Sequence, residues 1–372
     1  MRLQVVQQPS RCYIMLSSLR TRLDQHYSCQ RRPSHIVFGP VMHSRATHNS
    51  VFSNCAKWRL SKAKRTNLEV ISPRHFLRFR IAWIAGECYV LSTTVTGASS
   101  GFGKALTEVV LRKGDIVVAT LRKPSVLATL TKQYPPSQLL LLALDVTRPS
   151  DISAAFTRTQ EVFGRLDVVF NNAGYGYFGE VEAIPDENAR ALLEVNFWGA
   201  VGVSRAAVKF FREVNAHGKG GILLQNSSML GISGGPGVTL EGFTDSFSKE
   251  IPPEWNIKIC ILQPGSFDTK LLSGTFFAPH PAYGNSATVT RRDFYRNVVP
   301  EGDPYKFAEM LHQLVVGADE GEKMPFFLPI GEDALAKLRH RLKRMGKTLV
   351  DVTPLSTDMK KDGKKAKTMA KL

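Results

Sequence analysis

Acidic residues are scarce in this chain, which has 32 Asp and Glu against 49 Lys and Arg and a formal net charge of +17. The imbalance is confined to the two ends. Residues 1–90 hold 15 basic and three acidic side chains, residues 360–372 hold six Lys and one Asp, and residues 91–359 are formally neutral. A core without a basic surplus argues against a nucleic-acid partner, because phosphate backbones are bound by clustered positive charge.

Zinc-type cysteine spacings and long apolar runs are also lacking. None of the five Cys falls in a Cys-x-x-Cys or Cys/His pattern, so no metal site is predicted. No uncharged apolar stretch reaches the ~18 residues of a transmembrane span, since residues 81–95 contain Glu87. These absences favour a reducing, cytoplasmic compartment. The Arg- and Ser-rich start of the chain keeps mitochondrial targeting open as a minor alternative.

The chain changes character near residue 88. Residues 1–87 show no sustained periodicity and predict a disordered basic extension, or residues that do not belong to the mature protein. Residues 88–355 alternate short apolar runs with amphipathic stretches, which is typical of βαβ units. We therefore predict an α/β fold, a Rossmann doubly wound parallel sheet in a single domain, followed by a solvated basic tail at 356–372.

Strands and helices are predicted from these periods. The apolar run Leu139–Leu144 predicts a fully buried strand, as in parallel sheets covered on both faces. The other predicted strands are Tyr89–Val95, Asp115–Thr120, Leu166–Phe170, Gly221–Asn226 and Ile257–Leu262; the predicted helices are Lys104–Lys113, Ser125–Tyr134, Ile152–Phe163, Asp186–Phe211, Thr239–Glu250 and Glu332–Lys347.

A glycine-rich turn joins the first predicted strand to the first predicted helix. Glycines there allow a tight turn and a close approach of the backbone to a pyrophosphate, while the helix directs its free N–H groups at the phosphates. A tight turn and nothing more is the alternative for such a motif taken alone. The candidate cofactor residues of this turn are Thr96, Gly97, Ser99, Ser100, Gly101, Phe102 and Gly103.

Further motifs follow in order down the chain, and together they resemble the classical short-chain dehydrogenase/reductase family over roughly residues 90–270. The steroid- and retinol-type members and fungal oxidoreductases are loosely similar. The resemblance implies adenine contacts at Asp145 and Val146, an Asn-Asn-Ala-Gly motif ending in Asn172, Ala173 and Gly174, a proton-relay role for Asn196, a catalytic role for Ser228, and nicotinamide contacts at Pro264, Gly265 and Thr269.

The end of the second predicted strand bears on the choice of cofactor. NAD-specific sites place an acid there for the ribose hydroxyls, whereas NADP-specific sites place a basic residue near the 2′-phosphate. Here the strand ends in Arg122 and Lys123 without an acid. Arg122 could bind a phosphate through two parallel hydrogen bonds. We therefore predict that the cofactor is NADP(H). The alternative is that Arg122 and Lys123 are ordinary surface charges and that the cofactor is NAD(H).

The residue pair that should move the proton is absent. The resemblance implies a Tyr that exchanges the proton with substrate and a Lys, one helical turn later, that lowers the Tyr pKa. None of the nine Tyr is followed four residues later by Lys. The Leu-Glu-Gly-Phe run that follows this pair in the family's pattern begins at Leu240, about eight residues or two helical turns early. In the family this helix also tends to form the subunit interface, so a homo-oligomer is in doubt.

Three hypotheses remain open. The first is an NADP-dependent oxidoreductase acting on an alcohol or ketone, impaired because losing a general acid/base costs on the order of 10²–10⁴ in rate. The second is a non-catalytic dinucleotide-binding or interaction protein on the same fold. The third is an active enzyme whose true sequence holds a segment missing here, which sequencing the transcript across Val238–Leu240 would reveal.

The segment after Thr269 is rich in aromatic residues, and the resemblance implies a mobile substrate lobe near 270–300. Phe276, Phe277 and Tyr283 would line an apolar pocket there. Ordinary packing against the sheet is the alternative. We expect a small-molecule substrate, an apolar alcohol or ketone, while the isolated His280 and His312 are expected to be structural or surface residues rather than ligands.

Overall fold

The computed structural model describes residues 2–8, 11–17, 90–233, 238–284, 292–293, 296–357 and 359. It divides into two compact units, Met1–Tyr89 and Val90–Leu372. In the first unit, β1 (Arg2–Gln8) and β2 (Arg11–Ser17) pair as an antiparallel hairpin, which the sequence periodicity does not predict. The remainder of the predicted 1–87 extension and most of the predicted basic tail lie outside the described residues, so their disorder stays a prediction.

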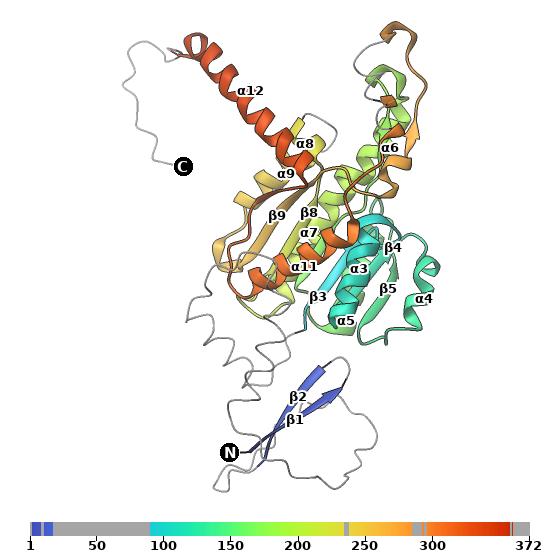
Figure 1. Ribbon diagram of the computed structural model, residues 1–372, viewed down its shortest axis with the longest axis vertical. Coiled ribbons are helices and arrows are strands. Elements are labelled where there is room, and N and C mark those ends of the chain that lie inside the picture. Colours follow the sequence, from blue (N-terminus) through green and yellow to red (C-terminus); the bar gives the residue numbers. More distant parts are fainter. Residues whose placement is uncertain are drawn as a thin grey trace. The chain divides into compact units, whose positions relative to one another are not determined.

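Seven parallel strands form the central sheet of the second unit, in the order β11-β9-β8-β6-β3-β4-β5 (Figure 1). The chain runs outward from β3 to β5 and then returns to continue from β6 to β11, so the sheet is doubly wound, as predicted. The order reverses between β3 and β6, where ligands of such sheets bind at the carboxyl ends. The strands are β3 (Ser92–Thr96), β4 (Ile116–Leu121), β5 (Leu139–Ala143), β6 (Val168–Asn171), β8 (Gly221–Asn226), β9 (Ile257–Pro264) and β11 (Phe327–Ile330).

Helices cover both faces of the sheet because successive strand residues point to opposite sides. Phe170 and Leu224 lie in one apolar cluster with α3 and α11, whereas Val169 and Leu223 lie in a second cluster with α5 and α7. Central strand β6 is buried along its whole length, as its apolar run predicts. These helices are α3 (Gly101–Lys113), α5 (Pro149–Phe163), α7 (Ala200–Glu213) and α11 (Pro304–Asp319).

The prediction of a fully buried strand at Leu139–Leu144 is wrong. Leu139 and Leu144 are buried, but Leu140–Leu142 are half-buried and Ala143 is exposed. The reason is position, because β5 is an edge strand of the sheet, so only one neighbour covers its flank. The predicted helix Ser125–Tyr134 is also shorter than expected, comprising η1 (Pro124–Leu127) and α4 (Ala128–Thr131), and the chain turns at Pro135.

The predicted long helix Asp186–Phe211 is interrupted by a π-helical turn. It consists of α6 (Asp186–Leu193), the π-helical η3 (Glu194–Gly199) and α7. Single π turns inside α-helices occur frequently at functional sites. This one holds Asn196, a predicted site residue.

The remaining elements connect these strands and helices, and most follow the carboxyl ends of strands, whereas η4 directly precedes β9. Among the described residues, no helix combines the length and apolar character needed to cross a membrane. The elements are β7 (Tyr177–Phe178), η2 (Val181–Ala183), α8 (Met229–Ser233), α9 (Val238–Lys249), η4 (Pro253–Trp255), η5 (Lys270–Ser273), β10 (Thr275–Phe276), η6 (Pro281–Tyr283) and α12 (Glu332–Ser356).

Candidate functional site at the carboxyl edge of the sheet

Three glycines shape the turn from β3 into α3. Gly97 and Gly101 have φ of +66° and +52°, the left-handed region that glycine adopts without steric cost. A Cβ on Gly103 would overlap the carbonyl oxygen of Gly97 and lie 2.8 Å from Asn172 Nδ2. Ser100 makes no side-chain cap, and the first turn of α3 holds no acid. No capping side chain therefore competes with an anionic ligand for the first N–H groups of α3.

The other two predicted residues of this turn differ in environment. Ser99 is exposed, so its hydroxyl faces solvent at the entrance to α3. The Phe102 ring instead stacks on Phe307 with 4.0 Å between ring centroids and packs edge-on against Phe267 at 5.2 Å. Phe102 thus fastens α3 to α11, and a contact with a cofactor would fall to its backbone.

A hydrogen-bonded chain of side chains ties the ends of β3, β6 and β8 together. The Thr96 hydroxyl accepts from the backbone N–H groups of Asn172 at 2.8 Å and Ala173 at 3.0 Å. Asn172 Nδ2 donates to the Thr96 carbonyl at 2.9 Å, and Asn226 Nδ2 donates to Asn172 Oδ1 at 3.0 Å. Asn226 Oδ1 is buried and has no partner in the structure. An unmet acceptor at this edge fits a site that takes a donor-bearing ligand.

The loop after β9 meets the glycine turn. Pro264 is the last residue of β9, and a Cβ on Gly101 would lie 3.2 Å from the side chain of Thr269. The Asp333 carboxylate accepts from Ser266 N at 2.7 Å and leaves no room for a Cβ on Gly265. The predicted Pro-Gly motif is therefore held by the first turn of α12, a contact that the sequence does not reveal.

The π-helical turn aims Asn196 at the segment after β6. Asn196 Oδ1 accepts from Tyr175 N at 3.1 Å, and its Nδ2 donates to the Tyr175 carbonyl at 2.7 Å. A Cβ on Gly174 would lie 3.2 Å from Asn196 Oδ1, a tight contact that glycine avoids. The structure thus brings Asn196 together with the Asn-Asn-Ala-Gly segment.

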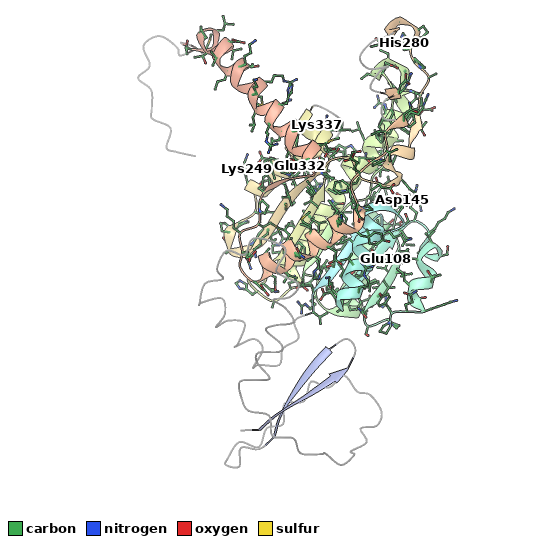
Figure 2. The ribbon with its side chains drawn as sticks, viewed as in Figure 1. Glu108, Asp145, Lys249, His280, Glu332 and Lys337 are labelled. Atoms are coloured by element: carbon green, nitrogen blue, oxygen red, sulfur yellow. The ribbon has the colours of Figure 1, made fainter. Side chains whose placement is uncertain are left out.

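Arg122 and Asp145 lie near one another at the ends of β4 and β5. Arg122 is exposed, and its positive charge acts on both Asp145 and Tyr175. Hydrogen bonds from the Thr147 hydroxyl at 2.8 Å and the Thr147 N–H at 3.0 Å lower the pKa of Asp145, with smaller contributions from nearby Arg side chains. Asp145 is therefore anionic at neutral pH. Figure 2 marks its position beside the sheet.

Val146 is buried beneath this edge. A Cβ on Gly199, at the end of the π-helical turn, would lie 2.7 Å from Val146 Cγ2. This contact packs the chain after β5 against η3. The Val146 side chain therefore packs inside the domain beneath the carboxyl edge. Because it is mostly buried, it exposes little surface to a ligand.

Ser228 lies between β8 and α8. It is half-buried, and its Oγ accepts from Leu230 N at 3.1 Å. The neighbouring Ser227 hydroxyl donates to Glu241 Oε1 at 2.7 Å, and Gln263 Nε2 donates to both Glu241 oxygens at 3.0 Å. Because α9 begins early, at Val238, it brings the Glu241 carboxylate against Ser227, the residue next to the predicted catalytic Ser228.

Three described tyrosines have a pKa that is shifted away from the range needed for proton transfer near neutral pH. Burial, followed by a hydrogen bond with Tyr177, raises the pKa of Tyr175 to about 12. Hydrogen bonds to Glu182 and Glu108 raise the pKa values of Tyr283 and Tyr305. These shifts are opposite in direction to the lowering that an adjacent Lys would produce.

The predicted substrate lobe packs through its aromatic rings. β10 pairs with β7 in a parallel two-stranded sheet, and the rings of Phe276 and Phe178 stack at 4.7 Å. Phe277 packs edge-on against Tyr177 at 5.3 Å. His280 accepts from Ala282 N at 3.3 Å at the start of η6, so it is structural as predicted. Residues 285–291 and 294–295 of the lobe lie outside the described residues.

His312 is also structural, as predicted. Its Nε2 lies 2.7 Å from Asp115 Oδ2, while Asp115 Oδ1 accepts from Leu91 N at 3.0 Å. The pair fastens α11 to the start of β4, at the opposite edge of the sheet from the site. Among the described residues, no cluster of three or more His, Cys, Asp or Glu could hold a metal ion.

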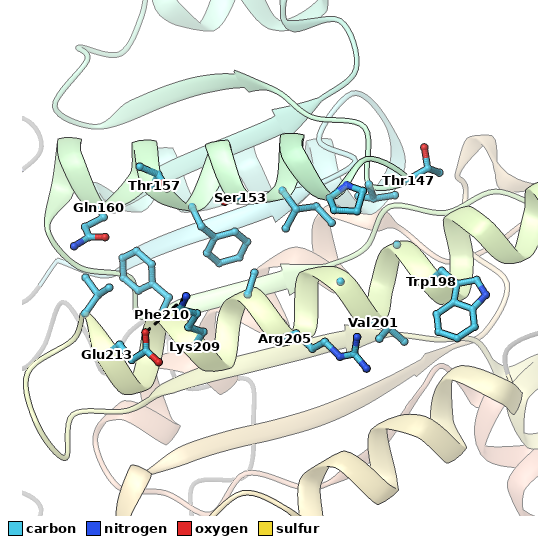
Figure 3. Close-up of a pocket in the computed structure, with 18 of the residues that line it drawn as sticks. Thr147, Ser153, Thr157, Gln160, Trp198, Val201, Arg205, Lys209, Phe210 and Glu213 are labelled. Atoms are coloured by element: carbon cyan, nitrogen blue, oxygen red, sulfur yellow. Dashed lines mark ion pairs between the residues drawn. The ribbon is translucent and has the colours of Figure 1, made fainter.

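A groove of about 760 Å³ runs between α5 and α7 on the outer surface (Figure 3). Phe156 and Phe210 line it, and Arg205 and the half-exposed Trp198 lie along α7 and η3. Of the predicted cofactor residues, only Val146 lines it. The groove is therefore separate from the glycine turn and the ends of β6 and β8.

Comparisons with known proteins agree with the geometry. The family model described as short chain dehydrogenase matches residues 92–276. An uncharacterized oxidoreductase of Schizosaccharomyces pombe is 36% identical over 280 residues, covering 72% of this chain and 91% of that protein. An oxidoreductase of Penicillium decumbens is 32% identical over 278 residues, covering 70% and 90%. The crystal structure of a short-chain dehydrogenase from Streptomyces avermitilis has a TM-score of 0.63 and 28% identity, covering 73% of this chain and 98% of that one.

Proposed function

Since this chain belongs to the short-chain dehydrogenase family, we propose that it binds NADP(H) at the carboxyl edge of its sheet and that its turnover of an alcohol or ketone is strongly impaired. The fit of the glycine turn to a dinucleotide carries the binding half of this proposal. The absence of a Tyr-x-x-x-Lys sequence carries the other half.

The residues at the carboxyl edge suit the parts of a dinucleotide. The Thr96–Gly103 turn and the start of α3 would receive the pyrophosphate through backbone N–H groups. Arg122, exposed at the end of β4, where the sequence of the strand places no acid, would bind the 2′-phosphate that distinguishes NADP(H) from NAD(H). Asp145 and Val146 would contact the adenine, and the Asn172–Gly174 and Pro264–Thr269 segments the nicotinamide end.

The bound nicotinamide would supply the hydride, and the chain would have to supply orientation and a proton. Ser228 would hold the substrate oxygen through its hydroxyl. Asn196, fixed by two hydrogen bonds to the Tyr175 backbone, would order the path by which a proton reaches the site. With no Tyr beside a Lys, the final proton donor is absent, and a loss on the order of 10²–10⁴ in rate is expected.

Two measurements on the full chain test these halves separately. Titration of NADPH and NADH fluorescence should give saturable binding with a preference for NADPH, while cofactor oxidation against a panel of apolar ketones should be slow. Equal affinity for both cofactors would refute the Arg122 assignment. Robust turnover would refute the impairment.

A non-catalytic dinucleotide-binding or interaction protein on the same fold is the second candidate. It is favoured by the position of Glu241, whose carboxylate is committed to Ser227 and Gln263 beside the place where proton transfer would occur. Tight NADPH binding with no turnover on any ketone or alcohol would support this candidate over a slow enzyme.

A further inference from the structure

Helix α12 (Glu332–Ser356) is attached to the domain only near its start. Ala334 is fully buried and Asp333 bonds to the loop after β9, but every residue from Leu342 to Ser356 is exposed. Figure 1 shows the helix extending away from the sheet beyond α8. Only the first turns of α12 therefore pack against the domain.

The exposed part of α12 has a continuous apolar face. Its apolar residues are separated by alternating steps of four and three, so at 100° per residue they fall within an arc of about 100°. Leu342, Met345 and Leu349 are 61%, 53% and 67% exposed. Soluble domains rarely leave such a face uncovered unless it binds something. The exposed residues of the face are Leu342, Met345, Leu349 and Val352, and the half-buried Leu335 and Leu338 continue it toward the attached end of the helix.

The opposite face of the same helix is basic. Residues 334–350 contain six Lys and Arg and no acid. Within the described part of the chain, none of the six forms an ion pair with a carboxylate, and Arg341 contacts only Met345 Sδ at 3.2 Å. Figure 2 marks Lys337 near the attached end of the helix. The basic residues are Lys337, Arg339, Arg341, Lys343, Arg344 and Lys347.

Charge decides which partner suits this helix. The apolar spacing would also suit a coiled-coil seam with a second copy. In such a pair, however, the six positive charges of one helix would lie beside the six of the other and repel them. Residues 360–372 of each copy would add six Lys and only one Asp. An anionic lipid surface satisfies both faces, because apolar side chains enter the boundary between headgroups and acyl chains while Lys and Arg meet the phosphates.

We propose that α12 is an interfacial helix that docks this protein on anionic phospholipid surfaces, lying in the plane of the membrane. The apolar face and the polybasic charge supply the two signals that stable peripheral binding requires. This docking does not depend on the cofactor or on turnover, so it stands or falls separately from the proposed function.

Vesicle flotation of the full chain tests the proposal. Binding is expected to vesicles of phosphatidylcholine with about a third phosphatidylserine, and little binding to pure phosphatidylcholine. Leu342→Glu with Leu349→Glu should weaken binding about 10²-fold or more by removing apolar contact. Lys343→Gln, Arg344→Gln and Lys347→Gln together should weaken it about 10²-fold and lower its salt dependence.

Matched control variants separate α12 from the other charged parts of the chain. Val126→Glu with Val299→Glu changes two exposed apolar residues elsewhere, and Lys132→Gln, Lys306→Gln and Lys323→Gln remove three exposed charges elsewhere. Both controls should bind vesicles as the unchanged chain does. Equal losses in controls and α12 variants, or vesicle binding untouched by the α12 variants, would overturn the proposal.

A fluorescence readout distinguishes lipid insertion from other partners. Met345→Trp lies at the centre of the apolar face, so its emission should shift to the blue on anionic vesicles. Binding without this shift would mean attraction by charge alone and would refute an inserted helix. A dimer in sedimentation that Leu342→Glu dissociates, without vesicle binding, would assign the face to a second copy. Capture of an acidic amphipathic peptide, with no vesicle binding, would assign it to a protein partner.

Discussion

The two halves of the carboxyl edge differ in what holds their functional groups. In the cofactor half, meaning Thr96–Gly103, Asn171–Gly174 and Pro264–Thr269, backbone groups and amides from separate strands interlock through the Thr96–Asn172–Asn226 chain. In the proposed proton-transfer half, meaning Ser228 with α8 and α9, the short helix α8 follows Ser228 directly, and the Glu241 carboxylate of α9 accepts from the neighbouring Ser227. Under the proposed function, nucleotide binding and proton delivery would therefore depend on separate parts of this edge.

The largest expected effect comes from restoring the proton donor. Inserting an eight-residue helical segment with Tyr-x-x-x-Lys between Val238 and Thr239 should raise kcat for a ketone by on the order of 10²–10⁴. The same insertion with Phe in place of Tyr is the matched control and should leave kcat low. Steady-state oxidation of NADPH measures both. Equal kcat values for the Tyr and Phe insertions would show that the missing tyrosine hydroxyl is not the cause of the low activity.

The next effect probes cofactor choice in the intact half. Arg122→Gln should weaken NADPH binding by roughly 10- to 100-fold, because a hydrogen bond to a charged group contributes about 1.5–3 kcal/mol. NADH affinity should be unchanged. Lys123→Gln, one residue further and equally exposed, should have a smaller effect on NADPH. Fluorescence titration decides, and an equal loss for both cofactors would contradict a 2′-phosphate contact.

A third effect tests how tightly the cofactor half is packed. Gly103→Ala forces a methyl group against Gly97 O and Asn172 Nδ2, and overpacking of this kind costs about 1–3 kcal/mol. Gly242→Ala is the control, because it is exposed in α9 with no atom within 4 Å of a new Cβ. The control should gain about 0.5–1 kcal/mol from helix propensity. Urea unfolding of both variants measures the difference, and destabilisation of the two by similar amounts would contradict the close approach.

The smallest effect is on ionisation. Because folding raises the pKa of Tyr175 to about 12 from its usual 10, its neutral form is favoured in the folded state. Its contribution to stability should be complete below pH 10 and decline as pH rises from 10 to 12. Phenolate absorbance should show late-ionising tyrosines, and Tyr175→Phe should remove one that ionises near pH 12. Ionisation of that phenol near pH 10 would contradict the desolvated position.

Local signals predicted much of the fold. Apolar runs such as Val168–Phe170 mark central strands, and the glycine turn marks the entry to α3, because each depends on neighbouring residues alone. The edge position of β5 was not predictable, since the same leucines suit either place in a sheet. The π-helical turn at Asn196 also escaped prediction, because it is fixed by contacts with the separate segment after β6.

The candidate site shows the same division. Its motif residues are those that the family resemblance implies, and the structure brings them together at the ends of β3, β6, β8 and β9, with Arg122 and Asp145 at the ends of β4 and β5. Asn226, Glu241 and Asp333 were missed, although each makes a hydrogen bond that shapes the site. Their partners lie 54, 14 and 67 residues away in sequence, so no local pattern marks them. Asn226 carried the one available signal, as a polar residue ending an apolar strand.

The bond from Asp333 to Ser266 makes the root of α12 part of the loop that would receive the nicotinamide. A truncation that ends the chain before Glu332 would remove the Asp333 carboxylate. The Ser266 N–H would lose its acceptor, and Gly265 would lose the side chain that packs against it. A shortened protein would then report altered nucleotide affinity for reasons unrelated to membranes or charge. The first turn of α12 thus stabilises the candidate site, whereas the rest of the helix extends away from the domain.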